Sequence, residues 1–225
     1  MKESILYEDN HLLVVNKAAG VLVQGDQTGD TPLVELLKDY LKVKYNKPGK
    51  VFLGVVHRLD RPTSGVVVFA RTSKSLTRLN QQFAQREVQK TYWALVPKGL
   101  PKTKDRLEHW LVRHSQKNKS FAYDKPQSDA KRAVLNYHKY QTMDRYEVLE
   151  IELETGRHHQ IRSQLSKIGF PIKGDLKYGA ARSNKDGSID LHARKIKFNH
   201  PVKKEPLTIV APPPKKPLWL SVLSD

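Results

Sequence analysis

The stretch HRLDRPTSG, residues 57–65, places one carboxylate, Asp60, between the two arginines Arg58 and Arg61. Apolar runs precede and follow it, so we expect a turn between two short buried strands, at 51–56 and 66–70. A carboxylate that stays ionised beside cations can act as a nucleophile or as a general base. An aspartate that only shapes the turn is the alternative.

A second candidate group lies in TGRHHQIRSQLSKIG, residues 155–169, which has a helical pattern ended by Gly169. With ~100° between successive residues, Arg162 lies about 60° from Leu165, at the edge of the apolar stripe. We therefore expect a half-buried guanidinium that requires a carboxylate partner. The sequence does not select Asp60 over the other acids, and a surface glutamate is an alternative partner.

The histidines and the absence of cysteine limit the other chemistries. His158 and His159 are adjacent, so on a helix they point ~100° apart, and no acid or third histidine is suitably spaced for a metal site. His57 is interpreted as a packed side chain. The chain has no cysteine, which excludes disulfides, thiol nucleophiles and cysteine-bound zinc.

Composition indicates a globular protein of 225 residues with 38% hydrophobic and 28% charged residues. No apolar stretch approaches the ~20 residues that span a bilayer, so no membrane is expected. The first residues, MKESILYEDN, contain acids where a signal peptide would be apolar. A reducing cytoplasm is therefore the expected location.

The net charge of +17, from 40 Lys and Arg against 23 Asp and Glu, indicates a polyanionic partner. The excess is concentrated at 113–139 and 194–216. RNA or DNA is the favoured partner, and a generally basic, solubilising surface is the alternative.

The expected elements alternate irregularly between strands and helices, which favours one α+β domain over 1–225 with an extended, largely antiparallel sheet. We predict a strand, turn and strand at 11–23, a helix capped by Thr31, a helix capped by Ser73, strands at 90–96, 106–112, 132–140 and 146–154, and a closing hairpin at 191–212.

Several motifs then agree in order and spacing: HRLDRPTSG, KTYWALV, ETGRHHQIRSQL, GDLKYG and LHA. Together they resemble the RluA family of pseudouridine synthases, from about residue 6 to about residue 210. The resemblance implies the α+β pseudouridine synthase fold with a central cleft. It also leads us to expect the catalytic domain alone, without the RNA-binding module that many relatives carry ahead of it.

The resemblance also implies roles for individual residues. Asp60 corresponds to the catalytic aspartate, and Arg58 helps to hold open the space left by a flipped nucleotide. Tyr92 stacks on the target uracil, and Arg162 forms an ion pair with the catalytic aspartate. The family often has TGRTHQIRVH, so His158 and Ser163-Gln164 are departures. They put local substrate contacts in question and leave the chemistry intact.

The implied activity is the isomerisation of uridine in tRNA or rRNA to pseudouridine, which needs no cofactor and no metal. We expect a monomer with no obligate protein partner. A catalytically silent RNA-binding protein is one alternative, but such a descendant has no reason to retain Asp60, Tyr92 and Arg162 together. A metal-dependent nuclease is another, and the lack of a carboxylate cluster argues against it.

Overall fold

The structure is a computed structural model that describes residues 4–223. The chain divides into two compact units, each described here by itself. Unit 1 contains the residues up to Gln89 together with Ala193–Pro214, and unit 2 contains Lys90–His192 and the residues from Lys215. Both combine strands with a few helices, which confirms the predicted α+β class. The single catalytic domain over 1–225 stays a prediction.

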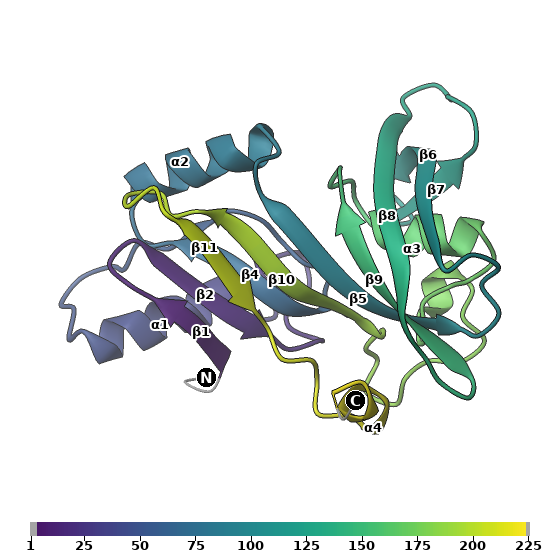
Figure 1. Cartoon of the computed structure of the whole chain (residues 1–225). Helices are drawn as coiled ribbons and strands as arrows, with labels where there is room; N and C mark the ends of the chain where they lie inside the picture. Colours follow the sequence, from purple (N-terminus) through teal and green to yellow (C-terminus); the bar gives the residue numbers. More distant parts are fainter. Residues whose placement is uncertain (1–3, 224–225) are drawn as a thin grey trace. The chain divides into compact units, whose positions relative to one another are not determined.

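In unit 1 a sheet runs in the order β1-β2-β4-β10, with β3 beside β4 and β11 beside β10 (Figure 1). Every residue of β4 is buried, so this strand forms the centre of the unit's core. The β10–β11 pair is antiparallel and confirms the predicted closing hairpin. The strands are β1 (Ile5–Glu8), β2 (Leu12–Lys17), β3 (Gly54–Val55), β4 (Ser64–Ala70), β10 (Leu191–Asn199) and β11 (Pro206–Val210), and the helices are α1 (Leu33–Lys44) and α2 (Ser73–Ala84).

The predicted strand after Gly20 is wrong. The carbonyls of Leu22 and Val23 instead accept hydrogen bonds from the first N–H groups of α1, at Leu33 (2.7 Å) and Val34 (3.2 Å). This segment therefore satisfies the exposed donors of the helix N-terminus, a task that side-chain caps usually perform.

Both predicted helix caps are one residue away from the observed ones. The N-cap of α1 is Pro32, which makes no side-chain hydrogen bond, so the predicted Thr31 cap is wrong. The N-cap of α2 is Thr72 in place of Ser73, and its hydroxyl accepts from Ser75 N at 3.1 Å.

In unit 2 an antiparallel sheet has the order β5-β9-β8-β6-β7. The four predicted strands are confirmed, whereas the short β7 was not predicted. The helix α3 contacts β6 and β7 (Figure 1). The elements are β5 (Gln89–Pro97), β6 (Lys104–His114), β7 (Lys119–Tyr123), β8 (Lys131–Thr142), β9 (Tyr146–Leu153), α3 (Gln160–Lys167), η2 (Leu176–Tyr178) and α4 (Pro217–Ser221).

The helix α3 begins later than the predicted start of its motif. Its N-cap, His159, has a left-handed backbone with φ 52° and no side-chain cap bond. The side chain of Gln160 instead accepts from Thr155 Oγ1 (2.8 Å) and Arg157 N (2.9 Å), and donates to Val134 O (3.0 Å). These contacts explain why the residues before α3 form a compact turn bound to β8.

No helix within residues 4–223 is both long and apolar enough to cross a membrane.

Candidate functional site

Asp60 lies in a tight turn that leads into β4. Its carbonyl accepts from Thr63 N at 3.0 Å. The last residue of the motif, Gly65, has φ +121°, and a Cβ there would lie 2.4 Å from backbone atoms of Ala193. Only glycine fits this conformation and this close approach. The backbone after Asp60 is therefore fixed by its own turn and by its packing against Ala193.

A buried lysine, Lys17 at the end of β2, also holds the backbone of this turn. Its Nζ donates to the carbonyls of Ala18 (3.0 Å), Val21 (2.8 Å) and Arg61 (3.2 Å), and its side chain is almost inaccessible. Burial lowers the pKa of Lys17 to about 8, while the nearby charge of Asp60 acts in the opposite direction. Lys17 was not among the predicted site residues. The signal that could have found it is a charged residue at the end of the apolar run LLVV.

The two arginines beside Asp60 have different surroundings. Arg61 belongs to the turn structure, because its Nε donates to Gly20 O (3.0 Å) and its Nη2 pairs with Asp30 (2.6 Å). Arg58 is exposed. His57 accepts from Val68 N at 3.1 Å and stacks on Phe83, which agrees with its interpretation as a packed histidine.

In unit 2, Tyr92 lies in the middle of β5, opposite Ile151 of β9. Its side chain is largely buried. The alternation of the strand places Lys90 on the same face of β5 as Tyr92, and burial lowers the pKa of Lys90. Tyr92 thus lies in a strand, as predicted for residues 90–96.

Arg162 is more deeply buried than predicted, with 4% of the residue exposed. Its Nε and Nη2 pair with the two carboxylate oxygens of Asp175, at 2.7 and 2.9 Å. Asp175 is itself buried and belongs to the GDLKYG motif. The carboxylate partner that the helical wheel required within this unit is therefore Asp175, which the sequence analysis did not single out. The predicted ion pair of Arg162 with Asp60 stays a prediction.

Tyr178 connects three elements around Arg162. Its ring lies 4.9 Å from the guanidinium, and its hydroxyl contacts Ser120 N (2.8 Å) and His159 Nδ1 (2.9 Å). Burial, followed by the positive charge of Arg162, lowers the pKa of His159 to about 2. His159 is therefore neutral at physiological pH, and this packing holds α3, β7 and η2 together.

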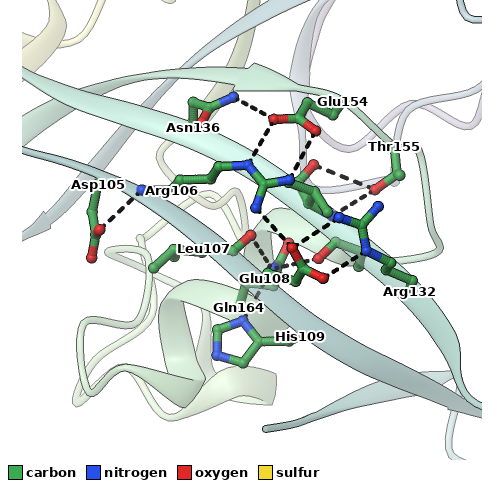
Figure 2. A network of polar contacts seen from close by, with 12 residues as sticks. Asp105, Arg106, Leu107, Glu108, His109, Arg132, Asn136, Glu154, Thr155 and Gln164 are labelled. Atoms are coloured by element: carbon green, nitrogen blue, oxygen red, sulfur yellow. Dashed lines mark hydrogen bonds and ion pairs between the residues drawn. The ribbon is translucent and has the colours of Figure 1, made fainter. Parts of the chain in front are cut away.

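The departures from the family pattern have two different structural roles. Gln164 is fully buried, and its Nε2 lies 3.2 Å from Leu107 O, 3.2 Å from Ala133 O and 3.0 Å from His109 Nδ1 (Figure 2). Ser163 is also buried and donates to Gln160 O. Gln164 therefore joins α3 to β6 and β8, whereas the bond of Ser163 stays within α3.

His158 lies at the surface side of the same segment. Its Nδ1 contacts Ser120 Oγ (2.9 Å) and its Nε2 contacts Asn118 Oδ1 (3.2 Å). The prediction that His158 and His159 point apart on a helix is wrong, because both precede α3 and their rings stack at 3.8 Å. Among residues 4–223, no three His, Asp or Glu side chains gather as possible metal ligands.

Comparison with known proteins identifies relatives of the whole chain. The family model described as RNA pseudouridylate synthase matches residues 11–167. The chain is 36% identical to ribosomal large subunit pseudouridine synthase D of Xanthomonas campestris, over 94% of the chain and 66% of that protein. It is 33% identical to tRNA pseudouridine synthase C of Pectobacterium carotovorum, over 92% of the chain and 58% of that protein. The chain thus spans less than two thirds of the length of these relatives.

A solved structure agrees on the fold. Human RNA pseudouridylate synthase domain containing 4 matches with a TM-score of 0.80 and 24% identity, over 99% of this chain and 92% of that one.

Proposed function

Because the chain belongs to the RNA pseudouridylate synthase family, we propose that it isomerises uridine to pseudouridine in tRNA or rRNA. Relatives named for each of these RNA classes support the choice of substrate. The net charge of +17 is also suited to a polyanionic substrate.

The observation that carries this proposal is the fixed turn at Asp60. A hydrogen bond from Lys17 to Arg61 O and the tight packing of Gly65 hold the backbone that follows this carboxylate. The ammonium of Lys17 and the carboxylate of Asp60 attract each other. A carboxylate on a fixed backbone needs less ordering before it meets a bound substrate.

Asp60 would act on the sugar. In one route its carboxylate bonds to C1′ as the N1–C1′ bond breaks, and C5 of the rotated uracil then displaces it. In the other route the carboxylate removes a proton from C2′ and later returns it. In both, the proton lost from C5 is balanced by one taken up at N1, so the reaction is an isomerisation and consumes no co-reactant.

The other site residues would prepare the substrate for this step. The uridine must leave its stack, and we propose that Arg58 occupies part of the space that it vacates. Tyr92 would stack on the uracil. Asp175 engages Nε and Nη2 of Arg162, and we propose that another part of this guanidinium pairs with Asp60. We further expect one catalytic domain that acts as a monomer in the cytoplasm, without a cofactor or metal.

Mapping pseudouridine in total RNA, from cells with and without the gene, tests the proposal. We expect pseudouridine to be lost at one or a few positions in tRNA or large-subunit rRNA, and to return with a plasmid copy of the gene. An unchanged map, with the gene expressed in the parent strain, would refute the activity. RNA binding that persists with an unchanged map would indicate the silent RNA-binding alternative.

A further inference from the structure

A group of cations surrounds the hairpin between β6 and β7. We call Arg113, Lys117, Lys119 and Lys177 the hairpin cluster. Arg113, Lys117 and Lys177 are exposed, and Lys119 is partly exposed. Lys119 and Lys177 are close together, because Lys119 Nζ lies 4.9 Å from the ring of Tyr178 and Lys177 Nζ lies 3.3 Å from Asn118 O. Arg113 pairs with Ser120 across the hairpin, and Lys117 lies in its turn.

The hairpin cluster is not neutralised by acids. Within residues 4–223, none of its four members forms an ion pair with a carboxylate. On the same sheet, by contrast, Arg106 and Arg132 pair with Glu108 at 2.7 and 2.6 Å (Figure 2). The basic segment at 113–139 therefore contains cations that are paired with carboxylates, such as Arg132, and cations that are not. The structure distinguishes the two kinds, whereas the sequence does not.

A buried histidine experiences the positive field of this cluster. Burial lowers the pKa of His159 most, followed by the charges of Arg162 and His158, and the charges of Lys177 and Arg113 add smaller contributions. The charge of Arg162 is matched by Asp175. The field at this place therefore includes charge that the protein does not neutralise, and such a surface attracts anions.

The hairpin is also held in a fixed conformation. Asn118 has φ 42° and its N–H donates to Ser115 O at 3.0 Å. Because the side-chain oxygen of Asn118 only accepts, His158 must donate from Nε2, and its Nδ1 then accepts from Ser120. Thus His158, where the family often has threonine, anchors the hairpin to the segment before α3. Ordered cations lose less conformational entropy on binding than mobile ones.

We propose that the hairpin cluster binds phosphates of the RNA substrate, next to the segment that carries Arg162. The identity of the anion as RNA rests on the proposed function. A closely spaced set of uncompensated lysine and arginine side chains is the usual means of binding a nucleic-acid backbone. Phe121, which lies 5.2 Å from Lys119 Nζ, places an aromatic ring beside these cations, as suits a partner that has both phosphates and bases.

A charge-matched comparison tests the proposal. The test variant combines K117Q, K119Q and K177Q, and the control combines K47Q, K50Q and K74Q, three exposed lysines of unit 1. The probe is a fluorescently labelled RNA hairpin with a uridine-rich loop, titrated at several salt concentrations. We expect the test variant to bind about tenfold more weakly and to lose about 2 from the slope of log affinity against log salt, since each phosphate contact contributes about 0.7–0.9. We expect the control to change less than about threefold.

Two further measurements keep the outcome interpretable. The double variant R113Q/K117Q changes only exposed side chains. It replaces the triple variant in the binding experiment if the triple variant has a lowered melting temperature. Pseudouridine formation is measured in parallel over a range of RNA concentrations, and we expect the test variant to show a raised KM. Equal losses of RNA affinity in the test and control variants would overturn the proposal. It would also be overturned if the test variant bound RNA as the wild type does but lost binding to an acidic protein. Absent pseudouridine formation in the wild type, with the binding difference intact, would refute the proposed activity and leave this surface standing.

Discussion

The turn at Asp60 and the helix start at Arg162 hold a charged side chain in different ways. Around Asp60 the backbone is fixed, by Lys17 and by the packing of Gly65. Around Arg162 the side chain itself is fixed, by a buried carboxylate on one edge and by the ring of Tyr178. The first arrangement tolerates the loss of the functional side chain, because the backbone keeps its own support. The second arrangement does not tolerate such a loss, because removing either Arg162 or Asp175 leaves the other as an unpaired buried charge.

The largest expected effect comes from Asp60→Asn. The amide preserves the shape of the turn but removes the anion, so pseudouridine formation should fall by at least about 10³-fold. RNA affinity and melting temperature should change little. The matched control is Asp30→Asn, which removes an exposed carboxylate bound to Arg61 and should retain activity. If Asp60→Asn melts like the wild type and still converts uridine at a comparable rate, Asp60 only shapes the turn.

Replacing either member of the Arg162–Asp175 pair should affect both properties. Arg162→Ala leaves Asp175 charged and buried, and we expect a loss of about 3–5 kcal/mol in the free energy of unfolding together with loss of activity. Asp175→Asn keeps the guanidinium but weakens its hold, so we expect a smaller loss of stability and a lower kcat with little change in KM. Denaturant unfolding and single-turnover kinetics measure the two effects.

The control for this pair is Asp190→Asn. Asp190 is also buried and binds Lys173 at 2.8 Å in the same unit. We expect it to lose stability without a matching loss of kcat. Should Asp175→Asn and Asp190→Asn reduce kcat equally, the Arg162–Asp175 pair has only a structural role.

Much of this organisation could be predicted from local pattern. Alternation located β5, β6, β8 and β9, and the helical wheel placed Arg162 beside the apolar stripe. Local pattern did not identify Asp175, because it lies in a loop 13 residues from Arg162 and follows no periodicity. Nor did it exclude a strand after Gly20. There the buried ammonium of Lys17 donates to Val21 O, and the first N–H groups of α1 donate to the carbonyls of Leu22 and Val23. In both cases the deciding hydrogen bonds join groups that no strand or helix periodicity relates.

Lys17→Met tests whether the backbone of the Asp60 turn depends on the buried ammonium. The variant keeps most of the length of the side chain but leaves three carbonyls without this donor, so we expect a loss of about 2–3 kcal/mol in the free energy of unfolding. Activity should fall less than in Asp60→Asn. Lys38→Met, which removes a partly exposed lysine paired with Glu35, should cost less than about 0.5 kcal/mol. Equal stability of the two variants would show that the turn does not need Lys17.

The smallest expected effect is the dependence of stability on pH through His159, in the Arg162 region. Its pKa in the folded protein is about 2, against about 6.5 in an unfolded chain. The unfolded state therefore takes up a proton below about pH 6.5 that the folded state does not. The corresponding stability is fully present above that pH and is lost as pH falls from about 6.5 towards about 2. Between about pH 7 and about pH 5 the loss should be about 1–2 kcal/mol.

His159→Asn isolates this contribution, because asparagine tolerates the left-handed backbone at φ 52° and does not titrate. The variant also loses the contact with the hydroxyl of Tyr178, which should lower its stability by a similar amount at every pH. The carboxylates are the same in both proteins, so the difference between the two pH profiles reports His159 and its coupling to the stacked His158. Denaturant unfolding at several pH values should give a steeper acid loss for the wild type. Parallel profiles would mean that His159 accepts a proton in the folded protein near its ordinary pKa, and that the positive charge around it is weaker than these contacts imply.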